Sequence, residues 1–325
     1  MSNRVWFDAR SLSRGYTSGW ERYVRELSRY LPNLIDITLW NPDVSNRLSL
    51  LLSDYFYQKS QIGHSLVHYP TYPPRKLNKN FKKIITVHDL TWWDYPQTSS
   101  FLGKFYYKKH MEQAILEADL IITPSRAIKS EINQKFFIDL NKITSIPHGN
   151  SLPKGIISKP SRPYFLSIGT IEPRKNLDFY SKAIDESKLK NNFDFIHVGR
   201  TGWGNLPKNL KLQTVKNDQD LANLILNAQA VVIPSLYEGF GLPVLESHAQ
   251  GTPVILSNDP ALIELSNGQD KTFELGNVNS LVESILHFSD TNKKLPIELI
   301  NEANSFTWEK SAQAHVETYL RLLNE

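Results

Sequence analysis

The sequence of 325 residues contains no cysteine. Disulfide bonds, thiolate-bound zinc, iron–sulfur clusters and cysteine nucleophiles are therefore excluded. The sequence also lacks an uncharged apolar run of the roughly 18 residues that a membrane-spanning helix needs. Its first apolar run, residues 5–7, is much shorter than the apolar region of a signal peptide. These absences predict a cytoplasmic protein whose chain does not cross a membrane.

Length and composition predict a globular protein with two domains. A chain of 325 residues is too long for one small core, and 40% apolar with 22% charged residues is typical of folded proteins. The net charge of +4 is uneven, because residues 1–154 hold 21 Lys and Arg against 13 Asp and Glu, whereas the remainder holds 16 against 20. A basic first half predicts an anionic partner, for which nucleic acid, anionic lipid and a phosphorylated substrate all qualify.

Short β-rich apolar runs alternate with longer helical patterns along the sequence, which is typical of parallel sheets covered by helices. The alternation pauses at residues 152–163, a stretch rich in proline and basic residues that we interpret as a linker between domains. Ligands of such folds bind beyond the carboxyl ends of the strands. The predicted strands are residues 5–7, 35–40, 66–69, 83–88, 120–123 and 143–147, then 164–168, 193–198, 212–215, 230–233 and 253–256.

The most informative motif is residues 234–246, PSLYEGFGLPVLE, followed by GTPV at 251–254. It predicts a strand, a glycine-containing loop and a helix that begins near Pro243, since glycine permits a tight backbone and proline is tolerated in a first helical turn. Glu238 precedes this helix and Glu246 follows about two turns later, so both carboxylates could face one elongated ligand. Alternatively, Glu238 complements the helix dipole and Glu246 is a solvated helix residue.

A second motif, residues 167–177, reads SIGTIEPRKNL. It predicts a strand, a turn at Gly169, two cations and the start of a helix. Arg174 and Lys175 at a helix N-terminus would form an anion site, suited to the charge that develops on a departing phosphate group. In the alternative interpretation they are solvated turn charges.

The first half offers His88 and Gly19 as candidate site residues. His88 lies in IITVHDL, residues 84–90, at the carboxyl end of a predicted strand, where substrate-facing residues of α/β sheets lie. The alternative for His88 is a structural histidine. Gly19 begins a predicted helix after the loop RGYTS, residues 14–18, and the alternative for this segment is a plain flexible loop.

The motifs together resemble the signature of family 4 glycosyltransferases, which have the two-domain GT-B fold. The resemblance rests on the ordered series Pro-Ser, Glu-Gly-Phe-Gly-Leu-Pro, Glu and Gly-x-Pro-Val, and it is strongest over residues 169–264. It implies an α/β protein with two Rossmann-like domains whose parallel sheets face each other across a cleft. Residues 1–154 would then bind the acceptor, residues 155–310 would bind the nucleotide sugar, and a C-terminal helix, residues 311–325, would pack back on the first domain.

The resemblance also implies roles for individual residues. Lys175 and Arg174 would bind the diphosphate, Glu238 the sugar hydroxyls, Glu246 the ribose, and His88 the sugar from the opposite domain. The catalytic set implied is His88, Glu238, Lys175 and Arg174. The donor-binding set implied is Gly19, Gly169, Gly199, Glu238, Gly239, Phe240, Gly241, Leu242 and Glu246.

The implied enzyme moves a sugar from a GDP-, UDP- or dTDP-linked donor to a hydroxyl of a saccharide or lipid-linked saccharide, with retention at the anomeric carbon. It resembles bacterial surface-polysaccharide enzymes that transfer mannose or rhamnose. No metal or other cofactor is expected, because the Asp-x-Asp pattern at residues 218–220 is interpreted as a helix cap at Asp218. The alternatives are an epimerase, hydrolase or phosphorylase of the same fold, and a non-catalytic subunit of a glycan assembly complex.

Residues 92–109 mix aromatic side chains with cations, and further cations precede them. Such a segment predicts peripheral contact with the inner face of the plasma membrane, where a lipid-linked acceptor would be presented. The alternative is a core helix with a solvated basic face. No recognised motif supports a nucleic acid partner. The preceding cations are Arg75, Lys76, Lys79, Lys82 and Lys83.

Overall fold

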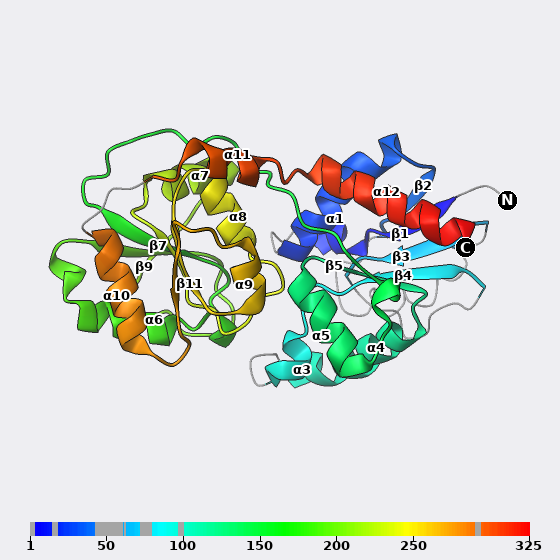
Figure 1. Ribbon diagram of the computed structural model, residues 1–325, viewed down its shortest axis with the longest axis horizontal. Coiled ribbons are helices and arrows are strands. Elements are labelled where there is room, and N and C mark those ends of the chain that lie inside the picture. Colours follow the sequence, from blue (N-terminus) through cyan, green and yellow to red (C-terminus); the bar gives the residue numbers. More distant parts are fainter. Residues whose placement is uncertain are drawn as a thin grey trace. The chain divides into compact units, whose positions relative to one another are not determined.

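The computed structural model describes residues 4–14, 19–42, 61, 63–71, 80–96, 101–289 and 294–325, with side chains described for all of these except 13, 14 and 101–107. The chain divides into two compact units (Figure 1). The first comprises Met1–Gly149 together with Thr307–Glu325, and the second comprises Asn150–Phe306. The domain boundaries predicted from the sequence, after residues 154 and 310, lie a few residues later than these.

The first unit is built on a parallel sheet with the strand order β2-β1-β3-β4-β5-β6. Its central strands consist almost wholly of buried residues, as expected for a parallel sheet that is covered on both faces. The strands are β1 (Val5–Asp8), β2 (Ile37–Trp40), β3 (Leu66–Tyr69), β4 (Lys82–Thr86), β5 (Leu120–Thr123) and β6 (Ile143–Ser145). The α-helices are α1 (Gly19–Tyr30), α3 (Thr91–Asp94), α4 (Phe101–Glu117), α5 (Arg126–Phe136) and α12 (Trp308–Asn324).

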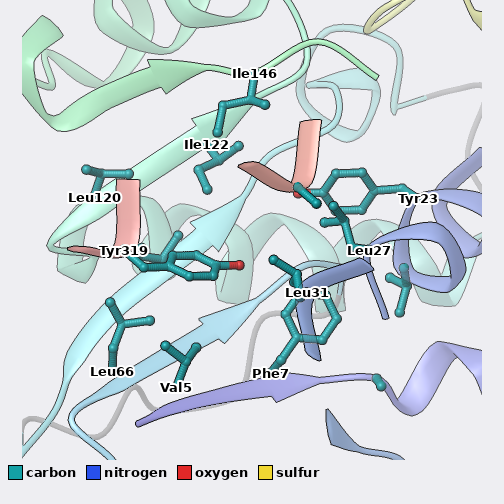
Figure 2. Close-up of a cluster of buried hydrophobic side chains, with 14 of the residues drawn as sticks. Val5, Phe7, Tyr23, Leu27, Leu31, Leu66, Leu120, Ile122, Ile146 and Tyr319 are labelled. Carbon is teal, nitrogen blue, oxygen red and sulfur yellow. The ribbon is translucent and has the colours of Figure 1, made fainter. Parts of the chain in front are cut away.

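The last helix, α12, packs against α1, with which it shares the core of the first unit (Figure 1). Its buried residues recur at helical spacing, so they form one stripe along the helix that contributes to this core. Figure 2 shows Tyr319 of α12 in the same cluster as Leu27 of α1 and Val5 of β1. The C-terminal helix is therefore a structural element of the first unit. The buried residues of α12 are Trp308, Ser311, Ala312, His315, Thr318, Tyr319 and Leu322.

The second unit repeats the parallel arrangement, with the strand order β12-β11-β10-β7-β8-β9. Both units are thus Rossmann-like, and the predicted α/β class is confirmed. The strands are β7 (Tyr164–Ile168), β8 (Asp194–Val198), β9 (Lys211–Gln213), β10 (Val231–Ile233), β11 (Val254–Ser257) and β12 (Lys271–Phe273). The helices are α6 (Leu177–Ser187), α7 (Asp218–Asn227), α8 (Leu242–Ala249), α9 (Pro260–Leu265), α10 (Val278–Ser289) and α11 (Ile297–Asn304).

Three sequence-based expectations about elements were wrong in detail. β12 was not predicted, since its three residues alternate little in polarity and lie at the edge of the sheet. The cap of α7 is Asn217, whose side chain accepts a hydrogen bond from the Asp220 N–H, whereas Asp218 is the first helical residue. β4 ends at Thr86, so His88 lies in the loop two residues beyond the strand.

The predicted linker contains no helix or strand, but it does not run free of the second unit. The Gln250 side chain accepts from the Gly155 N–H at 2.8 Å and donates to the Pro153 carbonyl at 2.9 Å. Farther along, the Ile156 N–H donates to Asn223 of α7 at 2.7 Å. Amide side chains thus supply hydrogen-bond partners to backbone groups of a segment that belongs to no helix or strand.

Candidate functional site

Two loops of the second unit leave the carboxyl ends of neighbouring strands, β7 and β10. After β7, the chain turns at Gly169 into a short 3₁₀ helix, Pro173–Lys175, and then into α6. After β10, residues 234–241 lead into α8. Because β7 and β10 are parallel, both loops emerge at the same edge of the sheet, which is where ligands bind in open α/β folds.

An ion-pair cluster centred on Glu238 joins the two loops. Lys175 Nζ lies 2.5 Å from Glu238 Oε1, and Arg174 Nη1 lies 2.9 Å from Glu238 Oε2. Arg174 also donates to Glu172 Oε1 at 2.7 Å and to the Tyr237 carbonyl at 2.7 Å. Lys175 and Glu238 are only 9% and 8% exposed. The cluster therefore fixes two positive charges at the carboxyl edge of the sheet.

Polar neighbours hold the Glu238 carboxylate in one orientation. The Ser235 hydroxyl donates to Oε1 at 2.7 Å, and the backbone N–H of Glu238 donates to Asp259 at 3.3 Å. Burial raises the pKa of Glu238, but the charges of Lys175 and Arg174 outweigh burial and lower this pKa to about 2. Glu238 is therefore an anion at neutral pH, able to accept hydrogen bonds from a ligand's hydroxyl groups.

Asp259 connects the Glu238 loop to α9. Its Oδ1 atom caps the helix by accepting from the N–H groups of Ala261 and Leu262, at 3.0 and 3.2 Å. Burial, and then the charge of Glu238, raises the pKa of Asp259 to about 6. The start of α9 and the Glu238 backbone are thus held by a single carboxyl group.

Two glycines, Gly169 directly after β7 and Gly199 directly after β8, lie where the packing leaves no room for a side chain. Gly169 has φ +144°, and a Cβ atom there would lie 2.7 Å from Cε of Lys175. A Cβ atom at Gly199 would lie 1.7 Å from the Gly169 carbonyl oxygen. That oxygen accepts from His197 Nε2 at 2.9 Å, so His197 Nδ1 accepts from the Ser167 hydroxyl at 2.8 Å. These contacts fix the path of Lys175 toward Glu238.

The residues around the start of α8 have different structural roles. Gly241 is the left-handed N-cap, with φ +97°, and half-buried Gly239 separates Glu238 from Phe240. The Phe240 side chain packs in a hydrophobic cluster, against which Leu242 also packs, so both side chains serve the core. Glu246, in the second turn, is 3% exposed, and the interpretation of it as a solvated helix residue is wrong.

In the first unit, His88 lies in an aromatic environment beyond β4. Its Nε2 atom donates to the Pro70 carbonyl at 2.8 Å, and burial lowers its pKa to about 4. The Trp20 ring stacks on the imidazole with centroids 6.0 Å apart, and the Tyr23 ring meets it edge-on at 4.8 Å. Gly19 is the exposed first residue of α1, next to Trp20. His88 is therefore a neutral imidazole at physiological pH.

The predicted residues thus fall into two groups. Gly169, Arg174, Lys175 and Glu238 are packed together in the second unit. The interpretation of the two cations as solvated turn charges is wrong, because both are paired with Glu238. His88 belongs to the first unit.

Three residues of the second-unit site were missed. Ser235 lies inside the recognised motif, so its hydroxyl could have been noted there. Asp259 is followed by proline and an apolar run, which is a recognisable helix-start pattern. His197 carries no local signal, because its contact with Gly169 depends on the pairing of β7 with β8.

The predicted membrane-docking segment is only partly described. Arg75, Lys76 and Lys79 lie outside the described residues, as do the side chains of 101–107. Where it is described, Trp93 packs edge-on against Phe136 at 5.2 Å, and Lys108 Nζ lies 5.0 Å from the centre of the Trp93 ring. These aromatic contacts are internal to the first unit.

Within the described residues, no helix combines the length and apolar character needed to cross a bilayer. Across the same residues, no group of three or more acidic or histidine side chains is placed to hold a metal ion.

Two protein-family models match the chain. Residues 152–305 match the model for glycosyl transferases group 1, and residues 59–152 match the model for glycosyltransferase family 4. The two matches adjoin, and the first contains the whole ion-pair cluster.

Among curated relatives, the O-antigen chain mannosyltransferase RfbU of Salmonella typhimurium is 28% identical over 227 residues. That alignment covers 63% of this chain and 63% of the Salmonella protein's own length. The O-antigen chain mannosyltransferase B of Escherichia coli is 26% identical over 278 residues, which is 76% of this chain and 72% of the relative.

Solved structures share the fold. A sucrose-phosphate synthase from Thermosynechococcus elongatus superposes with a TM-score of 0.81 over 99% of both chains, at 18% identity. HepE from Anabaena, solved in complex with UDP-glucose, superposes with a TM-score of 0.71 over 97% of this chain and 98% of HepE, at 14% identity.

Proposed function

The chain belongs to the glycosyltransferases of the GT-B fold, and from that premise we propose that it transfers a sugar from a nucleoside diphosphate donor to a saccharide hydroxyl in surface-polysaccharide synthesis. The observation that carries the proposal is the Arg174–Lys175–Glu238 cluster at the carboxyl edge of the second sheet. The Salmonella and Escherichia relatives are both named as O-antigen chain mannosyltransferases, which makes mannose the first donor sugar to test.

The cluster suits a diphosphate sugar because it offers fixed cations beside a fixed anion. Arg174 and Lys175 would take the diphosphate oxygens in place of Glu238. The Glu238 carboxylate, relieved of its partners, would accept hydrogen bonds from the sugar hydroxyls. Charge that builds on the departing diphosphate would then meet donors already in position, which is the main source of electrostatic catalysis.

The remaining residues of the site would orient the two substrates. Glu246 would hold the ribose, and His88 would accept a hydrogen bond from a hydroxyl of the sugar or acceptor. We propose that the anomeric configuration is retained, with the departing phosphate accepting the proton of the attacking hydroxyl. Two side-chain cations would neutralise the leaving group, so a metal ion is not required.

A thermal-shift screen tests the donor site. UDP, GDP, dTDP and ADP, and their sugars, are added without metal to the wild type, to Glu246→Ala and to Glu283→Ala, which removes an exposed carboxylate of α10. A ligand at about 100 times its Kd adds roughly 2.7 kcal/mol of stability. We expect one base to raise the Tm of the wild type and Glu283→Ala but not that of Glu246→Ala. Absence of a shift with every nucleotide would contradict the proposal.

A radiolabelled sugar linked to the nucleotide that binds is then used as the donor, to distinguish sugar transfer from other reactions. We expect label in an oligosaccharide acceptor. Free sugar without an acceptor would identify a hydrolase, and sugar phosphate formed with inorganic phosphate would identify a phosphorylase. Binding with no turnover of any kind would identify a non-catalytic subunit.

A further inference from the structure

A buried chain of hydrogen bonds crosses the core of the first unit and links α12 to β3, β4 and α1. Tyr319 Oη lies 2.7 Å from His68 Nδ1, and His68 Nε2 lies 2.8 Å from Thr86 Oγ1. Thr86 Oγ1 lies 2.9 Å from Tyr23 Oη, which lies 2.7 Å from His315 Nε2. All five residues are at most 2% exposed. Figure 2 shows Tyr23 and Tyr319 among the buried side chains of this core.

One end of the chain fixes the position of its protons. His315 Nδ1 lies 2.7 Å from the carbonyl oxygen of Ser311, and a carbonyl can only accept. Burial lowers the pKa of His315 to about 4, so its ring is neutral and carries its one proton on Nδ1. His315 Nε2 is therefore an acceptor, and the Tyr23 hydroxyl donates to it.

The remaining protons follow by elimination. Since the Tyr23 proton points to α12, the Thr86 hydroxyl donates to Tyr23. The proton on His68 Nε2 is then donated to Thr86, and Tyr319 donates to His68 Nδ1. Burial keeps the pKa of His68 well below its usual value, so its ring is neutral as well. Every link is satisfied in a single direction, and such networks are rigid when no member is left unpaired.

The Tyr23 ring connects this chain to His88. It meets the His88 imidazole edge-on, with an interplanar angle of 87°. Because His88 Nε2 donates to the Pro70 carbonyl, His88 Nδ1 carries a lone pair. Within the described residues no hydrogen bond to His88 Nδ1 is present. The Tyr23 ring contacts His88, and the Tyr23 hydroxyl is held by its hydrogen bond to His315 of α12.

We propose that Tyr23 and His315 are positioning residues for His88. The buried chain fixes the Tyr23 ring, and the ring keeps the His88 imidazole in one orientation, with Nδ1 free to accept a hydrogen bond from a substrate hydroxyl. The role of His88 toward a sugar rests on the proposed function. The positioning of the His88 ring, in contrast, is a property of the protein without ligand. The C-terminal helix is by this inference a component of the site, through His315.

The positioning is tested without ligand, by long-range ¹H–¹⁵N spectra of protein labelled at histidine. His88 is assigned with His88→Gln, and its Nδ1 and Nε2 signals are compared in the wild type, Tyr23→Phe and Thr86→Val. Both variants interrupt the buried chain of hydrogen bonds, and Thr86→Val does so while Tyr23 is kept. The matched control is Tyr180→Phe, which removes an equally buried hydroxyl with no hydrogen-bond partner among the described residues of the second unit.

We expect His88 of the wild type and Tyr180→Phe to show one tautomer, protonated at Nε2. In Tyr23→Phe and Thr86→Val both nitrogen signals should move toward the average of two tautomers, while the signals of His197 in the second unit stay fixed. His88 signals that match the wild type in both chain-breaking variants would overturn the proposal, even if those variants were less stable.

Kinetics supply a second readout. We expect Tyr23→Phe to lower kcat for transfer about tenfold while KM for the donor changes less than twofold, because the diphosphate would be held by the second unit. Unchanged kcat in Tyr23→Phe would overturn the role in catalysis. If the wild type transfers no sugar, the proposed function is wrong. The ligand-free spectra would still show whether Tyr23 and His315 position the His88 ring.

Discussion

At the scale of single residues, the site depends on charges that are buried together. Lys175 and Glu238 would each be costly to bury alone, and they are tolerated because each is paired and hydrogen-bonded. In the proposed function, a diphosphate would supply the negative charge that lets the pair separate. The pair itself links the loops that follow β7 and β10.

Replacement of Lys175 tests this arrangement. Lys175→Met should lower kcat/KM for transfer by about 10²- to 10³-fold, because a donor to the leaving group is lost from a water-poor site. Initial rates measure the effect, with donor and acceptor varied separately. The control is Lys182→Met, at an exposed lysine of α6 whose side chain is 66% accessible. Equal rates for the two variants would remove Lys175 from the mechanism.

At the scale of elements, the chain returns to the first unit just before α12. The Asn150 N–H donates to the Phe306 carbonyl at 2.8 Å, and a Cβ atom at Gly149 would lie 2.1 Å from the backbone nitrogen of Trp308. Thr307 then caps α12 by accepting from the Lys310 N–H at 3.2 Å. The start of the last helix is therefore fixed by backbone contacts and one cap.

Loss of this cap should destabilise the first unit. Thr307→Ala is expected to cost about 1 kcal/mol, since an N-terminal N–H loses its acceptor, and to lower Tm by roughly 3 °C. Thr307→Ser keeps the hydroxyl and should stay close to the wild type. Calorimetry or circular dichroism measures the difference, and an alanine variant as stable as the serine variant would show that the cap contributes nothing.

At the scale of the whole molecule, the two units should differ in their response to acid. Burial lowers the pKa of four histidines of the first unit, to about 4 for His88 and His315 and well below the usual value for His68 and His148. In the second unit, burial lowers the pKa of His197 to about 4. The first unit thus holds four histidines that burial keeps neutral.

Acidification should therefore unfold the first unit first. A histidine with a lowered folded pKa contributes fully above its unfolded value of about 6.5, and the contribution is lost as pH falls toward the folded pKa. Each such histidine costs up to about 1.4 kcal/mol per pH unit in that window. Amide hydrogen exchange between pH 7 and pH 5 should show protection falling more steeply in the first unit. Parallel losses in both units would contradict the expectation.

The sequence by itself determined the fold class and which strand ends carry the candidate site residues of the second unit. Alternating strand and helix patterns require parallel sheets, and continuous apolar strands such as β1 require cover on both faces. The glycine-rich loop with Glu238 and the Arg-Lys pair are local signals, so they could be placed at strand ends without coordinates. The short edge strand β12 lacked such a signal.

Only the tertiary structure decided which of these residues meet. Lys175 and Glu238 are 63 positions apart, and Tyr23 and His315 are 292 apart. Neither pairing follows from local spacing, since it depends on strand order and on the docking of α12. Propensity and pattern act over a few residues, whereas buried charges and hydrogen bonds are satisfied by whatever the completed fold brings within about 3 Å.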